Sequence, residues 1–103
     1  MTEEIKQENK PDNVVFVGGK SVRVYAEAVE IQFEEKGSKE VILKTRGKYM
    51  VSAINASEFL KRKSEGKIKV ISITIGSESF KDKEKNKDIW VSTLEIKLIK
   101  EWI

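Results

Sequence analysis

The chain has 103 residues and lacks both cysteine and histidine, which fits one domain and excludes disulfides, thiolate chemistry, most zinc sites and a histidine general base. Its net charge is +3 and 36% of its residues are charged, a balance that permits a polyanionic partner. No apolar stretch approaches the roughly 18 residues of a membrane helix. We therefore expect a cytoplasmic protein with no membrane partner, cofactor or metal.

The first 12 residues differ in composition from the rest of the chain. The segment MTEEIKQENKPD carries four acids against two lysines and has almost no apolar side chains. Such a segment cannot bury enough apolar surface to offset the entropy of ordering it. We predict a disordered acidic tail over residues 1–12 and one basic domain over residues 13–103.

The domain begins with an apolar run and a glycine turn. Residues 14–17, Val-Val-Phe-Val, are typical of a buried strand. Gly18 and Gly19 break the run, and Ser21 can cap a helix that Gly37 is suited to end. The apolar residues of that helix recur at three- and four-residue steps and are Val22, Ala26, Val29 and Phe33.

The letters Gly19-Lys20-Ser21 also end the phosphate-binding P-loop pattern G-x-x-x-x-G-K-[S/T]. That pattern needs a first glycine where this chain has Val14, and a β-branched residue continues a strand instead of opening a wide loop. The sequence therefore excludes a P-loop. It leaves a lysine at the start of a helix, where unpaired N–H groups and the helix dipole favour an anion.

A second strand and helix follow with the same arrangement. Glu40–Thr45 reads as a strand, Gly47 breaks it, and a helix is predicted from about Tyr49 to Ser64, with Gly66 after it. The side of this helix that we expect to be buried consists of Met50, Ala53, Ile54, Ser57 and Leu60.

From Lys67 onward the apolar pattern changes to a period of two, which indicates strands. Ile71, Ile73 and Ile75 share one face of the first strand. Trp90, Leu94, Ile96 and Leu98 share one face of the second, and the charged residues 77–88 connect them. The order β-α-β-α-β-β predicts an α/β two-layer sandwich with a four-stranded mixed sheet, two helices and a long hairpin between the last two strands.

So small a sheet leaves apolar surface for a second chain. We therefore expect a dimer, either of identical chains or with a paralogue, whose interface contains Trp90, Leu94 and their neighbours.

Basic residues cluster at the two predicted strand-to-helix turns. Lys20 lies at the first turn, and Lys48 follows Gly47 at the second. Lys44 and Arg46 are two apart on a strand and so point the same way. If the two strands are parallel, both turns leave from one edge of the sheet, and Lys20, Arg46 and Lys48 meet on one surface. The alternative is charge distributed for solubility, and two basic turns at corresponding positions favour a binding function.

The predicted hairpin carries a third basic cluster, in which lysines alternate with polar and acidic residues. An extended conformation would place Lys81, Lys83, Lys85 and Lys87 on one side as a cationic ribbon suited to a groove. A loose charged loop is the alternative, and the pattern taken alone favours that loop.

These landmarks resemble the Alba (Sac10b-type) family of archaeal nucleic-acid-binding proteins. The similarity rests on NVVFVGGKSV at 13–22, EVILKTRGK at 40–48, IGS at 75–77 and VSTLEI at 91–96. It implies the same β-α-β-α-β-β fold, a dimer, and binding of double-stranded DNA and RNA with little sequence preference. It also implies that Lys20, Lys44, Arg46 and Lys48 face phosphates, and that the hairpin lysines form arms along the minor groove.

The leading hypothesis is therefore a chromosome-associated protein that coats or bridges double-stranded DNA and also binds RNA. The alternative is an RNA-binding structural subunit of a ribonucleoprotein, in which exposed aromatic residues such as Tyr49 or Phe80 would stack on bases. An enzyme is not expected. The paired carboxylates Glu34-Glu35 and Glu78 with Asp82 lack metal-ligand spacing and read better as solvated charges.

Overall fold

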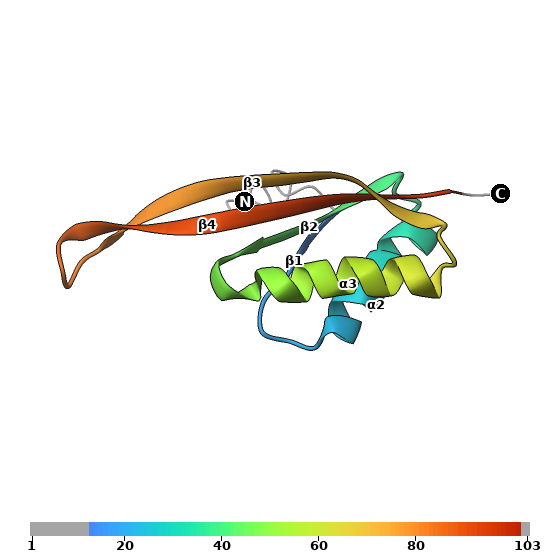
Figure 1. Cartoon of the computed structure of the whole chain (residues 1–103), viewed down its shortest axis with the longest axis horizontal. Coiled ribbons are helices and arrows are strands. Elements are labelled where there is room, and N and C mark those ends of the chain that lie inside the picture. The colour runs from blue at the N-terminus through green and yellow to red at the C-terminus, as the bar shows by residue number, and fades with distance from the viewer. Residues whose placement is uncertain (1–12, 102–103) are drawn as a thin grey trace, which may run out of the picture.

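The computed structural model describes residues 13–101, so the predicted acidic tail over residues 1–12 lies outside the described part of the chain. The order of elements predicted from the sequence is confirmed (Figure 1). The elements are β1 (Val14–Phe16), α2 (Val22–Glu34), β2 (Glu40–Arg46), a 3₁₀ turn η1 (Gly47–Tyr49), α3 (Met50–Lys63), β3 (Ile68–Asp82) and β4 (Lys87–Lys100).

The four strands form one mixed sheet in the order β1-β2-β4-β3. β1 and β2 run parallel, whereas β4 is antiparallel to both of its neighbours. Parallel strands need a crossover connection, which α2 provides between β1 and β2 and α3 provides between β2 and β3. Both helices lie against the same face of the sheet, which confirms the two-layer sandwich. The face without helices is called the open face below.

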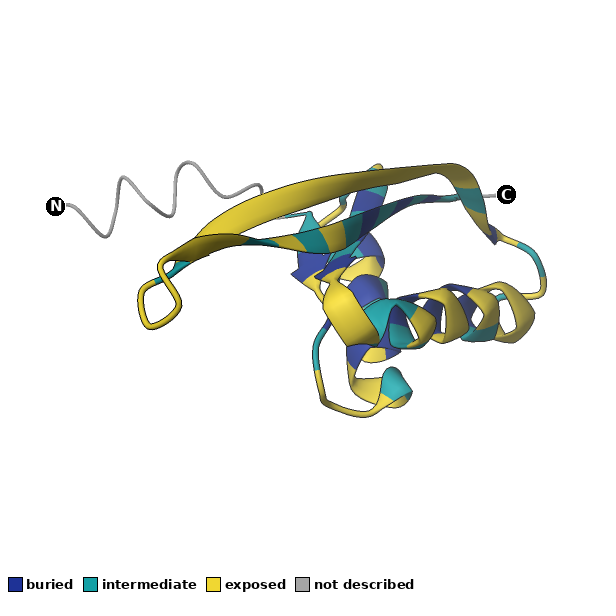
Figure 2. Cartoon of the chain, turned by 60° about the vertical axis from the view of Figure 1, so that its left-hand side comes forward, coloured by how far each residue is buried: buried dark blue, intermediate teal, exposed yellow. Residues whose placement is uncertain are grey.

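The core lies between the two helices and the sheet face that they cover (Figure 2). Side chains alternate along a strand, so every second residue of β2 and β4 points toward the helices. α2 adds Ala26, Val29 and Phe33 from its predicted stripe. Val22 is only partly buried, and Tyr25, which the prediction omitted, is buried in its place. The buried apolar side chains are Val15, Val17, Tyr25, Ala26, Val29, Phe33, Val41, Leu43, Ala53, Ala56, Leu60, Ile68, Leu94, Ile96 and Leu98.

The prediction of which residues of α3 are buried is partly wrong. Ile54 is 45% exposed, while Ala56, which the prediction omitted, is fully enclosed. The buried stripe is Ala53, Ala56, Ser57 and Leu60. Three of these four side chains are small, so α3 can lie close to its neighbours, and the larger Ile54 falls on the flank of the helix.

The predicted strand in the apolar run 14–17 is present, but it is buried on one face only. β1 ends at Phe16, whose side chain is 56% exposed, and only Val15 and Val17 are buried. The reason is that helices cover one face of the sheet, so alternate residues of β1 face the open side. Phe16 lies opposite Lys44 of β2 on the open face.

The long hairpin predicted between the last strands is confirmed, and it extends beyond the rest of the sheet. β2 pairs with β4 only as far as Arg46 opposite Thr93, whereas β3 and β4 stay paired out to Asp82 opposite Lys87. Residues 77–92 therefore form a two-stranded ribbon, called the arm below. Figure 2 shows that the arm is mostly exposed.

Candidate nucleic-acid interface

The turns that follow β1 and β2 lie side by side at one edge of the sheet. Because the two strands are parallel, their carboxyl ends meet at that edge. A Cβ atom on Gly19 would lie 3.6 Å from the ring of Tyr49 in the second turn. Lys20 follows Gly19 directly and Lys48 precedes Tyr49, so the fold brings these two lysines to one edge. The two turns are called the basic edge below.

Tyr49 forms the contact between the turns of the basic edge. Its ring packs against Gly19 on one side, and the Nζ atom of Lys48 lies 5.5 Å from the ring centroid, within cation–π distance. Gly47 has a φ of +67°, a conformation that glycine adopts without strain, which explains a glycine before Lys48.

The N–H groups of the first turn are less available to an anion than the sequence suggested. The N–H groups of Gly18 and Lys20 donate to the hydroxyl oxygen of Tyr25 at 2.8 and 2.9 Å. Ser21 is the N-cap residue of α2, but its side chain makes no capping hydrogen bond. The backbone groups left to bind an anion are therefore the N–H of Gly19 and the first N–H groups of α2, and Lys20 supplies the full charge.

Lys44 and Arg46 point the same way, as their spacing predicts, but each has an acidic neighbour on the open face. The Nζ atom of Lys44 lies 3.6 Å from a carboxylate oxygen of Glu95 on β4. A guanidinium nitrogen of Arg46 lies 3.3 Å from a carboxylate oxygen of Glu78 on β3. A phosphate would have to displace these carboxylates.

The pairing of Arg46 with Glu78 spans three strands at the base of the arm. Arg46 is the last residue of β2 that pairs with β4, and Glu78 lies on the far strand of the arm. The guanidinium therefore reaches across β4, above Thr93. A hollow beside this bridge is lined by Phe16, Val17, Lys44, Arg46, Glu78 and Thr93. Sequence reasoning missed the two acids because their proximity depends on strand register.

The prediction that four lysines line one side of an extended hairpin is wrong. Residues 83–86 form a turn, which places Lys83 and Lys85 at the tip. Lys81 lies opposite Asp88, and Lys87 lies opposite Asp82, so these two lysines occupy opposite sides of the ribbon.

The chain must reverse at this point, and Asp82 organises the reversal. Its Oδ1 atom accepts hydrogen bonds from the N–H groups of Glu84 and Lys85 at 3.0 and 3.4 Å. Asn86 completes the turn with a φ of +53°. The four lysines thus gather around the tip of a defined hairpin instead of forming a row, and the loose-loop alternative is wrong as well.

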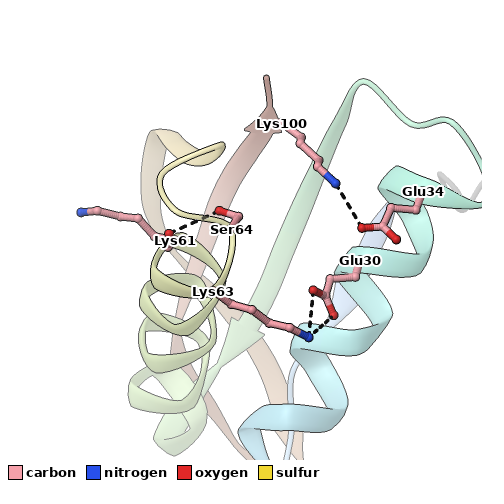
Figure 3. A network of polar contacts seen from close by, with 6 residues as sticks. All are labelled: Glu30, Glu34, Lys61, Lys63, Ser64 and Lys100. Carbon is pink, nitrogen blue, oxygen red and sulfur yellow. Dashed lines mark hydrogen bonds and ion pairs between the residues drawn. The ribbon is translucent and has the colours of Figure 1, made fainter. Parts of the chain in front are cut away.

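The opposite end of the molecule carries a different charge pattern (Figure 3). Lys63 at the end of α3 pairs with Glu30 of α2 at 3.1 Å, and Lys100 of β4 pairs with Glu34 at 3.1 Å. A helix of 14 residues spans roughly 20 Å, so this network is well separated from the basic edge at the start of α3. Its paired charges tie the two helices and the sheet together.

Residues 13–101 contain no group of three or more acidic, histidine or cysteine residues placed to hold a metal ion. None of the helices within residues 13–101 is long and apolar enough to cross a membrane.

Comparison with known proteins agrees with this architecture. The Alba family model matches residues 13–77. The DNA/RNA-binding protein Alba of Methanococcus maripaludis is 38% identical over 89 residues, which cover 86% of this chain and 99% of that protein. The protein of the same name from Nanoarchaeum equitans is 39% identical over 87 residues, which cover 84% of this chain and 96% of that protein.

Solved structures show the same fold. Alba from Thermoplasma volcanium superposes with a TM-score of 0.75 at 30% identity, covering 85% of this chain and all of that one. ALBA1 from Trypanosoma brucei has a TM-score of 0.71 at 22% identity, covering 89% of this chain and 72% of that one, which supports the fold alone. With the family model, the relatives and the fold in agreement, this chain belongs to the Alba family.

Proposed function

We propose that this protein is a dimeric, sequence-tolerant nucleic-acid-binding protein that coats or bridges double-stranded DNA on the chromosome and also binds RNA. The observation that carries the proposal is the basic edge, where two separate strand-to-helix turns bring Lys20 and Lys48 together. Relatives that share most of the chain are named DNA/RNA-binding proteins, which supports the same class of ligand here.

The chemistry of the basic edge and the arm suits phosphates better than bases. The cationic groups are lysines and one arginine on exposed turns and strand ends, and such groups bind phosphates through charge and counterion release. Phosphate contacts fix position and carry no sequence information. The arm adds a lysine-bearing tip on a ribbon slender enough to follow a groove, whose width it would read as shape.

A second copy of the chain is the proposed occupant of an exposed apolar surface beside α3. Ile73 and Ile75 of β3 are 61% and 78% exposed, and Trp90 of β4 is 69% exposed. In register, Ile73 and Ile75 lie opposite the core residues Ile96 and Leu94, so their side chains are on the helix-covered side of the sheet. We call Ile54, Ile73, Ile75 and Trp90 the apolar flank.

Ile54 belongs to this surface because of its position on α3. Arg23 of α2 lies over the ring of Phe59, at 5.7 Å from its centroid, which identifies the side of α3 that faces α2. Ile54 is five residues from Phe59 and therefore lies on the other side of the helix, toward β3. The expectation from the sequence that Leu94 contacts the second chain directly is wrong, because Leu94 is only 6% exposed and lies in the core.

A large exposed apolar surface is unusual for a monomer and marks an interaction site. Pairing of two apolar flanks would bury these side chains and would place two basic edges and two arms on one particle. That arrangement supports bridging or coating of a duplex.

The RNA-binding alternative has one specific observation in its favour. Phe80 on the arm is 50% exposed on the side of the ribbon that continues the open face, where it pairs with Ile89. An exposed aromatic ring can stack on an unpaired base. Tyr49, the other candidate for stacking, is packed between Gly19 and Lys48 and serves the basic edge instead.

A gel-shift series tests the proposal. Wild-type protein is titrated into a duplex DNA, a second duplex of unrelated sequence, and a structured RNA, each at three salt concentrations. We expect shifts with both duplexes at similar protein concentrations, and weaker binding as salt rises. No shift of any probe at the lowest salt would overturn the proposal, and a shift of RNA alone would favour the ribonucleoprotein role.

A further inference from the structure

The first turn of the basic edge contains two consecutive glycines whose backbone conformation does not require glycine. Positive φ angles occur at Gly37, Gly47 and Gly66, and at neither Gly18 nor Gly19. Glycine gives up more conformational freedom on ordering than any other residue. A turn of this composition is therefore ordered only if something outside the turn holds it.

Tyr25 provides that restraint. Its side chain lies one turn into α2 and is 7% exposed, packed in the core. Its hydroxyl oxygen accepts the N–H of Gly18 at 2.8 Å and the N–H of Lys20 at 2.9 Å. One buried oxygen thus fixes the backbone on both sides of Gly19, while the Gly19 N–H makes no hydrogen bond within residues 13–101.

The same contact replaces a capping interaction that the sequence suggested and the structure lacks. Ser21 caps α2 by position but makes no side-chain hydrogen bond to the helix. Tyr25 has a rigid ring with few rotatable bonds, and the core fixes its ring, so its hydroxyl is a stable anchor. The other end of the turn is held by the pairing of β1 with β2, through Val17 N–H to the Lys44 carbonyl at 2.8 Å and Thr45 Oγ1 to the Val17 carbonyl at 3.0 Å.

We propose that the Tyr25 hydroxyl is a positioning group for nucleic-acid binding: it pre-orders the first turn so that Lys20 is presented beside Lys48 before the ligand arrives. This inference rests on the proposed function, because it assigns Tyr25 a role in presenting the proposed phosphate contacts. Pre-ordering strengthens binding because the turn does not lose its freedom during association. Tyr25 itself need not touch the ligand.

The variant that isolates the hydroxyl is Tyr25→Phe, which keeps the ring in the core. We expect duplex binding to weaken by about threefold to tenfold at constant salt, the size of one or two net hydrogen bonds. The slope of log K against log salt should stay at the wild-type value, since no cation is removed. Lys20→Ala should instead reduce that slope by about one unit per chain.

A double variant separates positioning from a general loss of stability. If Tyr25 acts by presenting Lys20, then Tyr25→Phe should cost less affinity in a Lys20→Ala background than in the wild type. Equal losses in both backgrounds, or wild-type affinity for Tyr25→Phe, would overturn the inference.

Hydrogen exchange of the wild-type protein provides a readout that does not depend on the variant folding. The amides of Gly18 and Lys20 should exchange more slowly than the amide of Gly19, and equal rates for all three would overturn the restraint. Failure of the wild type to bind any nucleic acid would overturn the proposed function and this inference with it. Binding by the wild type combined with an unaffected Tyr25→Phe variant would overturn this inference alone.

Discussion

If Arg46 binds phosphate as proposed, the Glu78 carboxylate competes for its guanidinium, and removing the charge of Glu78 should strengthen binding. The two side chains are 3.3 Å apart and about half exposed or more, at 68% for Arg46 and 49% for Glu78. Exposed pairs of this kind contribute about 0.2–1 kcal/mol. The pair must open before Arg46 can contact a phosphate, so Glu78→Gln should raise affinity by up to about fivefold per chain.

The matched control for Glu78→Gln is Glu101→Gln. Glu101 forms a similar exposed pair, 3.0 Å from Lys69, at the end of the hairpin away from the arm. Both variants raise the net charge by the same amount. A difference in duplex affinity between them therefore reflects where the acid lies on the protein and not the overall charge.

Fluorescence anisotropy with a labelled duplex at low and moderate salt measures both variants. We expect tighter binding for Glu78→Gln than for Glu101→Gln, with the difference narrowing as salt screens the charges. Equal affinities would refute the competition between Glu78 and phosphate. Weaker binding by Glu78→Gln would mean that the bridge to Arg46 holds the arm in its binding orientation.

Arg46→Ala should weaken binding to unrelated duplexes by a similar factor, about 1–3 kcal/mol, with the melting temperature unchanged, and a change in the order of preferred sequences would require a base-reading role. Replacing the four arm lysines (Lys81, Lys83, Lys85 and Lys87) with serine should lower affinity and flatten the salt dependence of binding. The slope of log K against log salt should become less negative by about 0.9 for each phosphate contact that is lost. An unaltered slope would mean that the arm does not contact the duplex and that only the rest of the domain binds it. Ile75→Asp should convert a dimer into a monomer of 11.8 kDa by light scattering, while Ile31→Asp, on an exposed part of α2 outside the apolar flank, should leave the dimer intact. A wild-type protein that is monomeric well above micromolar concentration would contradict the dimer.

The sequence predicted those features that local periodicity controls. The order of elements, most of the buried stripe of α2 and the inward face of β4 follow from three- and four-residue steps and from alternation. Errors occurred where a side chain's environment depends on what covers it, as for Phe16 on the open face and Ile54 on the flank of α3.

Features that depend on register or on long-range contacts could not be predicted in this way. The Arg46–Glu78 bridge requires the alignment of three strands, and the Tyr25 hydroxyl meets Gly18 only after the turn has folded back on α2. The tip of the arm was also missed, because alternating charges look the same in a strand and in a turn. The Asp82 side chain that accepts two N–H groups is what distinguishes them.

In the proposed interface, the two turns of the basic edge contact phosphates together. The most direct test is the salt dependence of duplex binding for the wild type and for the Lys20→Ala/Lys48→Ala double variant. The wild type should give a linear decrease of log K with log salt, and the double variant should lose about two units of slope per chain, because each lysine removed leaves one phosphate un-neutralised. An unchanged slope and affinity in the double variant would mean that the basic edge does not contact the phosphates of the duplex.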